Sequence, residues 1–305
     1  MRGRILWLSF VVMAVMALTA CSLGEEIEKE KVHVVSSFSV LHDIVSKVGG
    51  ERVKADFLAP LGEDPHEFEP TPGTFRLMAE ADIIFYNGYN LDYWIQGLAR
   101  NAETQAKEVT LTDGVASIPL SEEAGDLSGA EDPHAWLDPN AVIIYAENVA
   151  QALIEQDPEG ADYYQSQLDA YIEELEDLDQ WIEEQVALIP EEHRFIVTSE
   201  SAFKYFARAY GFEYDAIWEI NAHEEGSPQQ MSRLIEKIID RQIPAVFLET
   251  SVDARPMERV AQDAGVDIGG RVFTDSLGTE GSNAVTYKDM MTHNVTVIVE
   301  GLRQQ

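Results

Sequence analysis

A single long helical pattern in the middle of the chain sets the limits on how it can fold. Between Asp157 and Pro190, apolar residues recur at steps of three and four, which places on one helical stripe Tyr164, Leu168, Tyr171, Leu175, Leu178, Ile182, Val186 and Ile189. Asp157-Pro158-Glu159 is a typical helix start, with Asp157 as the N-cap. A helix of this length measures about 45 Å. Because the stripe stands alone, we expect a helix that spans both halves of the chain rather than a coiled coil or an ordinary surface helix.

The segments on either side of this pattern alternate short β-branched runs with helical patterns. The predicted strands cover residues 32–36, 53–59, 82–86 and 108–111, then 194–198, 213–217, 245–249 and 270–273. The predicted helices cover residues 40–48, 74–81, 91–100 and 140–156, then 202–210, 228–241, 255–264 and 286–301. Such alternation indicates parallel sheets covered by helices. We therefore expect an α/β fold of two (β/α)4 lobes, residues 32–157 and 190–305, joined by one long rigid helix over residues 158–189.

The first twenty residues are expected to lie outside this fold. A positively charged start precedes an apolar run that is short for a membrane span but typical of a signal peptide, residues 1–20. The run ends in Leu18-Thr19-Ala20-Cys21, which resembles the lipobox of bacterial lipoproteins, and Cys21 is the only cysteine of the chain. The sequence thus predicts export, cleavage before Cys21 and acylation of its thiol. Residues 21–31 then form a flexible tether to the extracytoplasmic face of a bacterial cell membrane.

The charge balance excludes one class of partner. The chain has 55 acidic and 21 basic residues, which gives a formal net charge of -34. A surface this anionic repels phosphate backbones, so we expect no nucleic-acid partner. It also raises the local concentration of cations, but an adaptation for solubility explains the bulk charge better than a specific binding role does.

Two loops of the first half share one motif. Asp64-Pro65-His66 and Asp132-Pro133-His134 are each followed, two residues after the histidine, by an aromatic residue and then by an acid-proline pair. The prolines stiffen these loops and hold the preceding aspartates in extended geometry. A rigid loop that presents an imidazole suits a metal site, because preorganisation lowers the cost of binding. A single histidine of this kind is more often a turn residue, but the duplication favours His66 and His134 as metal ligands.

Two carboxylates of the second half occupy corresponding positions. Glu200 and Asp275 each follow a predicted strand, and in parallel sheets ligands bind beyond the carboxyl ends of the strands. Taken singly, Glu200 also suits a helix N-terminus and Asp275 suits a turn. Together with the two histidines they would form a ligand set drawn from both halves, with enough negative charge to neutralise a divalent ion.

These segments resemble the metal-binding lipoproteins of ABC importers, the cluster A-I solute-binding proteins. The resemblance covers essentially the whole mature chain and rests on the two Asp-Pro-His loops and on residues 197–206, 218–221, 224–226, 249–257 and 273–276. It implies two lobes joined by a long helix, and an ABC permease with its ATPase as partners of a monomer. It also implies metal ligands at His66, His134, Glu200 and Asp275.

The resemblance bears on the choice of metal as well. Zinc-specific relatives usually carry histidine at the position of Glu200 and often a histidine-rich loop where residues 121–132 lie. This chain has neither, so it resembles the manganese branch, and residues 121–132 are expected to form a solvated acidic loop. Carboxylates are hard donors that suit Mn²⁺, while imidazole also suits Zn²⁺. We therefore expect Mn²⁺ as the transported ion, with Zn²⁺ or Fe²⁺ as alternatives.

Two other functions fit the same residues. A metal-dependent hydrolase could use two histidines and two carboxylates, but it needs an open coordination position and a general base. The sequence contains no nucleophile elbow and no His-Glu-x-x-His motif, so we expect a binding protein and not an enzyme. A surface adhesin stabilised by its metal is the second alternative. The remaining histidines are expected to lie away from the site: His33, His42, His193, His223 and His293.

Overall fold

The structure is a computed structural model that describes residues 31–220 and 226–303. Val32–Gln305 form one compact unit. The predicted signal peptide, Cys21 and most of the tether fall outside the described residues, and so does His223.

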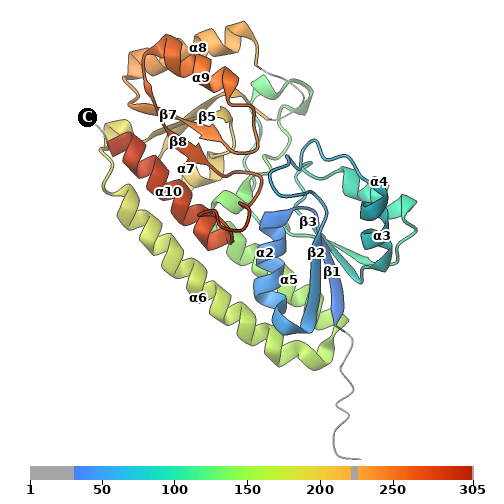
Figure 1. Cartoon of the computed structure of the whole chain (residues 1–305). Coiled ribbons are helices and arrows are strands. Elements are labelled where there is room, and N and C mark those ends of the chain that lie inside the picture. The colour runs from blue at the N-terminus through green and yellow to red at the C-terminus, as the bar shows by residue number, and fades with distance from the viewer. Residues whose placement is uncertain (1–30, 221–225, 304–305) are drawn as a thin grey trace, which may run out of the picture. The chain divides into compact units, whose positions relative to one another are not determined.

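The first half contains one four-stranded parallel sheet in the order β2-β1-β3-β4. Its strands are β1 (Val32–Ser36), β2 (Val53–Phe57), β3 (Ile83–Tyr86) and β4 (Lys107–Thr110). The central strands are almost wholly buried, as expected where helices cover both faces of a parallel sheet. The covering helices are α2 (Ser39–Gly49), α3 (Pro72–Glu80), α4 (Trp94–Asn101) and α5 (Pro139–Gln156). Figure 1 shows α2 and α5 on one side of the sheet and α3 and α4 on the other.

The second half also has four parallel strands, but they form two separate hydrogen-bonded pairs. β5 (Phe195–Glu200) pairs with β6 (Glu213–Trp218), and β7 (Ala245–Glu249) pairs with β8 (Asp267–Val272). β5 packs beside β7 without a backbone ladder between them. At the carboxyl end of this seam, the side chain of Glu249 accepts hydrogen bonds from the backbone N–H groups of Ser199 and Glu200. The helices of this half are α7 (Lys204–Tyr210), α8 (Pro228–Arg241), α9 (Arg255–Ala264) and α10 (Tyr287–Arg303).

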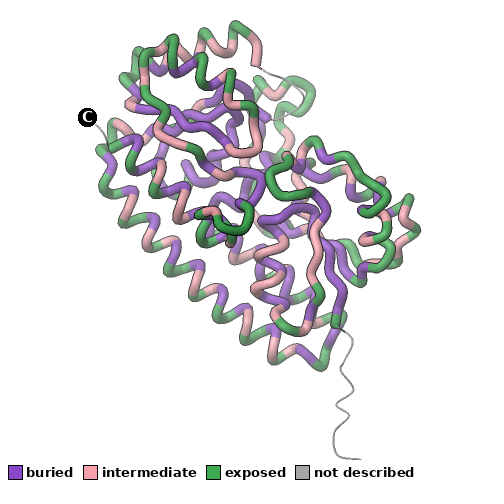
Figure 2. The backbone as a smooth tube through the Cα atoms, viewed as in Figure 1, coloured by how far each residue is buried: buried purple, intermediate pink, exposed green. Residues whose placement is uncertain are grey.

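The predicted linking helix is present as a short 3-10 turn, Pro158–Gly160, followed by α6 (Ala161–Val186). The 26 residues of α6 span about 39 Å at the usual helical rise. Its buried residues are seven of the eight in the predicted stripe, and the eighth, Ile189, is also buried but lies beyond the end of α6. They pack against α2 and α5 of the first half and α10 of the second, so α6 runs along both halves, as Figure 1 shows. In Figure 2 buried stretches recur along α6, separated by stretches that are exposed or intermediate, as expected of a helix with one buried side.

Asp157 occupies the predicted N-cap position, before the 3-10 turn Pro158–Gly160, but its side chain makes no capping hydrogen bond there. Instead the carboxylate is buried and accepts hydrogen bonds from the guanidinium of Arg52, at 2.9 and 2.5 Å, and from the hydroxyl of Tyr164, at 3.1 Å. This ion pair ties the segment before α6 to Arg52, which lies in the turn before β2.

One large hydrophobic core continues from the first half into the second. It combines the faces of the first sheet with the stripe of α6, the apolar residues of α7 and the inner face of α10. A smaller core lies between β5–β7 and the helices α8 and α9. The two halves therefore share buried apolar surface, which limits how far they can move apart.

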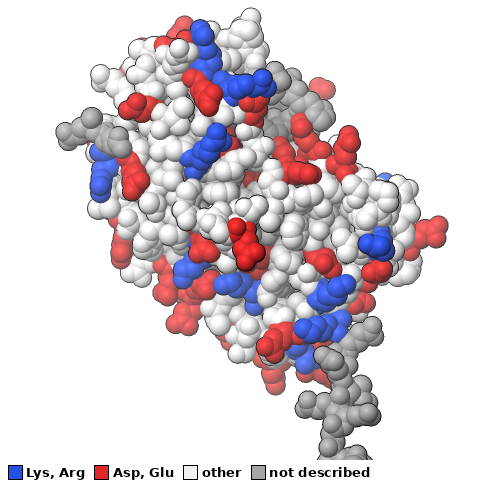
Figure 3. All heavy atoms as spheres, in the orientation of Figure 1, with Lys and Arg blue, Asp and Glu red and all other residues white. Residues whose placement is uncertain are grey.

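The surface of this unit carries the acidic excess of the sequence. Figure 3 shows acidic side chains spread over the viewed face, with basic side chains singly or in small groups among them. Within the described residues, no helix has both the length and the apolar character needed to cross a membrane.

Candidate metal centre

The first histidine loop follows β2 and is held by hydrogen bonds at both ends. Asp64 Oδ1 accepts a hydrogen bond from the backbone N–H of His66 at 2.8 Å. The indole N–H of Trp94 donates to the carbonyl oxygen of Pro65 at 3.0 Å, and the buried ring of Phe68 packs on Trp94 with a centroid distance of 4.6 Å. These contacts fix the loop on the start of α4, so His66 points from a rigid support.

The second histidine loop is held more firmly than the first. Asp132 Oδ1 accepts hydrogen bonds from the backbone N–H of His134 and from its ring Nδ1, both at 3.0 Å. With the proton on Nδ1, the lone pair of Nε2 is available for a metal. The Trp136 ring packs at a tilt against the His134 ring, and its indole N–H donates to the carbonyl oxygen of Thr274, which belongs to the second half of the chain. The loop is thus anchored on both halves.

The two carboxylates come from the ends of strands in the second half. Glu200 is the last residue of β5 and is fully buried. It does not cap α7 (Lys204–Tyr210), because the N-cap position of that helix is held by Phe203. Asp275 lies in the loop after β8 and is also fully buried. Its Oδ2 accepts hydrogen bonds from Thr274 at 2.7 Å and Ser251 at 2.9 Å. Its Oδ1 has no hydrogen-bond partner among the described residues.

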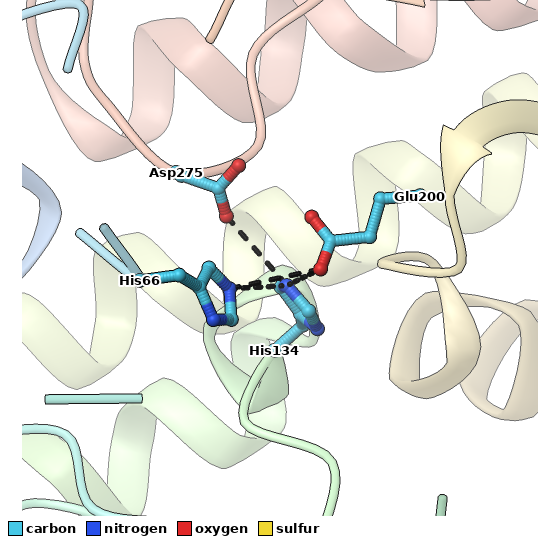
Figure 4. A group of neighbouring side chains, drawn as sticks. All are labelled: His66, His134, Glu200 and Asp275. Carbon is cyan, nitrogen blue, oxygen red and sulfur yellow. Dashed lines mark hydrogen bonds and ion pairs between the residues drawn. The ribbon is translucent and has the colours of Figure 1, made fainter. Parts of the chain in front are cut away.

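The four predicted residues converge, as Figure 4 shows. One ligand atom from each of His66, His134, Glu200 and Asp275 lies within 4.8 Å of the other three. The two Nε2 atoms are 3.4 Å apart, Glu200 Oε1 is 3.7 and 3.6 Å from them, and Asp275 Oδ1 is 3.6 Å from Nε2 of His134. Ligand bonds of about 2.1 Å in tetrahedral geometry separate neighbouring ligand atoms by roughly 3.4 Å. The spacing therefore matches a site that can hold one divalent metal ion.

The pKa values of the two histidines shift in opposite directions, because burial prevails for His66 but is outweighed by Asp132 for His134. Burial, reinforced by the neighbouring His134, lowers the pKa of His66 to about 4, so this ring is neutral at ordinary pH. Burial also acts to lower the pKa of His134, but the charge of Asp132 and its hydrogen bond to the ring outweigh burial and raise that pKa. His66 is thus ready to bind a metal as a neutral ring, while His134 is made more basic by its carboxylate.

Two buried ionisable residues behind the candidate ligands were missed by the sequence reasoning. Burial raises the pKa of Glu249 to about 8, despite the hydrogen bonds it accepts from the end of β5. Glu249 ends β7, so the rule that placed Glu200 at a strand end would also have found it. Lys204 forms an ion pair of 2.9 Å with Asp132. No spacing in the sequence signals this lysine, because its partner lies in the other half of the chain.

Two further predictions concern the acidic loop over residues 121–132 and the histidines outside the cluster. Residues Glu122–Leu127 form an exposed 3-10 segment, as expected of a solvated loop, but Asp132 at the end of the same acidic stretch is fully buried. Four histidines set aside from the sequence contact other groups: His33 contacts Asp56, His42 packs on Phe57, and His193 and His293 contact backbone carbonyl oxygens. The prediction for His223 stays a prediction because it falls outside the described residues.

Comparison with known proteins gives matches over almost the whole chain. Residues 34–301 match the family described as zinc-uptake complex component A, periplasmic. The manganese-binding lipoprotein MntA of Halalkalibacterium halodurans is 44% identical over 302 residues, which cover 97% of this chain and 98% of that protein. The manganese ABC transporter substrate-binding lipoprotein PsaA of Streptococcus pneumoniae is 41% identical over 305 residues, with 97% and 98% covered.

Solved structures agree with these sequence matches. The periplasmic zinc-binding protein TroA of Treponema pallidum superposes with a TM-score of 0.83 at 29% identity, over 90% of this chain and 99% of that one. The predicted two-lobe α/β fold is thereby confirmed.

The contact between Asp132 and His134 generates a first prediction. In Asp132→Asn the side chain keeps its shape but loses the charge that orients and activates the imidazole. We expect the affinity for Mn²⁺ to fall by about 10-fold to 100-fold, the usual effect of removing such a carboxylate partner. Titration calorimetry on the metal-free protein measures this change. The matched control is Asp177→Asn, an exposed aspartate on α6, which should leave the affinity unchanged.

Proposed function

The chain belongs to the family of periplasmic zinc-uptake components, and we propose that it captures Mn²⁺ for import by an ABC transporter. As a member of this family it is a substrate-binding receptor and not an enzyme, which removes the hydrolase alternative. One observation supports the metal role above all others: two imidazoles and two carboxylates from both halves of the chain meet in one buried cluster. Nothing in the described residues favours adhesion as a second function.

The cluster explains how a receptor of this kind could hold its cargo. A hydrated ion that enters exchanges its water for four protein ligands, and the charges of Glu200 and Asp275 balance the two positive charges of the ion. A balanced, ligated ion is tolerated in a buried site where a lone charge is not. Because the ligands come from both halves, release to the permease and its ATPase requires some separation of residues 32–157 from residues 190–305. The helix over residues 158–189 and the shared core keep that motion small.

The choice of Mn²⁺ over Zn²⁺ or Fe²⁺ rests on the carboxylate at position 200. Two carboxylates give a harder ligand set than one, and either can bind through both oxygens to raise the coordination number above four. Zn²⁺ prefers tetrahedral sites rich in nitrogen and sulfur ligands. The manganese-binding names of MntA and PsaA support the same choice.

The position of the receptor in the cell follows from its first residues. We propose that cleavage before Cys21 and acylation of its thiol anchor a monomeric receptor on the extracytoplasmic face of the cell membrane. The relatives named as lipoproteins support this anchor. Mass spectrometry of the exported protein should find a lipid-modified Cys21 at its N-terminus, and Cys21→Ser should release the protein from the membrane fraction. A Cys21→Ser protein that stays membrane-bound would count against the anchor.

The main test of the metal site removes its ligands one at a time. We expect His66→Ala, His134→Ala, Glu200→Ala and Asp275→Ala each to weaken Mn²⁺ binding by at least 100-fold, because each removes a direct ligand from a closed set. Titration calorimetry on the metal-free variants gives the dissociation constants. His293→Ala is the matched control, since this histidine contacts only the carbonyl oxygen of Arg271 among the hydrogen bonds described. Near-wild-type affinity in any of the four variants would remove that residue from the proposed site.

A second test addresses the choice of metal. Glu200→His leaves three imidazoles and one carboxylate, a set closer to what tetrahedral Zn²⁺ accepts. We expect this variant to lose more affinity for Mn²⁺ than for Zn²⁺, so the ratio of the two dissociation constants should shift toward zinc. The ratio is the informative quantity, since absolute affinity follows the Irving–Williams order and favours Zn²⁺ at most sites. A ratio that stays constant or moves toward manganese would show that position 200 does not set the preference.

A further inference from the structure

Lys204 is a buried cation placed behind the metal centre. It is the first residue of α7, four positions after Glu200, and it is only 2% exposed. Its Nζ lies 2.9 Å from Asp132 Oδ2 and 2.6 Å from Glu219 Oε1. Burying an ammonium group costs several kcal/mol unless such partners surround it. The fold has therefore placed this charge between two specific carboxylates.

The carboxylate of Asp132 is held from two sides. Its Oδ1 accepts hydrogen bonds from the backbone and the ring of His134, while its Oδ2 faces Lys204. The neighbouring Tyr205 donates from its hydroxyl to the backbone carbonyl oxygen of Asp132 at 2.7 Å. The start of α7 thus contacts both the carboxylate and the backbone of Asp132.

We propose that Lys204 is a positioning residue of the metal centre, which fixes Asp132 and through it places Nε2 of His134 relative to Glu200. This inference rests on the proposed function, because it assumes that His134 and Glu200 bind the same ion. It concerns how the ligands are held, and not which residues are ligands.

The position of Lys204 in the chain explains why it can do this. His134 and Asp132 belong to the first half, whereas Glu200 and Lys204 lie within one short stretch of the second half, where β5 ends and α7 begins. The ion pair therefore links the two halves directly beside two of the ligands. Lys204 is also linked to Ser121 of the first half through Glu219. Oε1 of Glu219 accepts hydrogen bonds from Lys204 and, at 2.6 Å, from the backbone N–H of Ser121.

Nε2 of His134 and Oε1 of Glu200 are 3.6 Å apart, close to the separation expected for ligands of one metal. Ligands already in place lower the ordering cost of binding, so their loss shows mainly as weaker affinity. A lysine that merely filled space or stabilised the fold would have no such effect on the folded protein.

The test replaces the charge while keeping most of the side-chain length. For the metal-free full chain we expect Lys204→Met to raise the Mn²⁺ dissociation constant about tenfold, the lower end of the range for groups that orient a metal ligand. Lys204→Arg keeps a cation that can still pair with Asp132 and should recover part of the affinity. Lys237→Met is the matched control: this lysine also pairs with a largely buried carboxylate of the second half, Asp215 at 2.6 Å, and its loss should leave the constant unchanged.

Two further measurements separate positioning from a purely structural role. The visible spectrum of the Co²⁺-loaded protein reports ligand geometry, and it should change in Lys204→Met but not in Lys237→Met. In a double-mutant cycle, Lys204→Met should weaken Mn²⁺ binding much less in the Asp132→Asn background than in the wild type, because the lysine acts through that carboxylate. The double variant leaves no uncompensated charge from this pair, so it remains usable if the single variant does not fold.

The outcomes distinguish this inference from the proposed function. Wild-type affinity and a wild-type Co²⁺ spectrum in folded Lys204→Met would overturn the positioning role. So would a double variant that binds Mn²⁺ tenfold more weakly than Asp132→Asn alone, since Lys204 would then act independently of Asp132. Failure of the wild-type chain to bind either Mn²⁺ or Zn²⁺ would overturn the proposed function, and this inference with it.

Discussion

The mutual repulsion of buried acidic groups is the constraint around which the rest of this structure is arranged. Glu200 and Asp275 are fully buried and face the same small space, and Asp132 and Glu249 lie directly behind the ligands. Like charges this close in a poorly polarisable interior disfavour one another. A divalent cation between the first two would relieve that repulsion, while Lys204 pairs with Asp132. Under the proposed function, acidic groups that would weaken an ordinary core become the source of metal affinity.

The unfavourable free energy of burying such groups together is offset by apolar packing elsewhere in the fold. The stripe of α6 packs against helices of both halves, and one hydrophobic core continues from the first sheet into α7 and α10. This shared apolar surface stabilises the compact unit and reaches the charged cluster itself, where Trp136 of the core packs on His134. The strand ends then carry the cluster, since the carboxyl edges of parallel strands are where side chains from several segments can meet. The apolar core therefore supplies the stability that allows the candidate metal centre to bury several acidic groups close together.

Some parts of this arrangement could be predicted from the sequence, and others could not. The α6 stripe, the strand-helix alternation and the four converging residues all follow from local patterns or from strand-end geometry. Three features depend on partners distant in sequence and could not be read from spacing. Asp157 accepts hydrogen bonds from Arg52 and none from the start of the helix that follows it, Lys204 pairs with Asp132, and Glu249 accepts hydrogen bonds from the end of β5. Each is a buried ionisable side chain whose partner is determined by the tertiary fold.

The two Asp-Pro-His loops show how far a repeated motif can diverge in its role. In the first loop Asp64 bonds to the backbone of His66, whereas in the second Asp132 bonds to both the backbone and the ring of its histidine. His66 lines a pocket of about 360 Å³ together with Tyr89, Leu91 and Leu127, while His134 is fully enclosed. The same three residues therefore produce an inner candidate ligand fixed by a charged network and an outer candidate ligand at the edge of the site. Duplication in the sequence supplies two imidazoles, but their surroundings in the fold make them unequal.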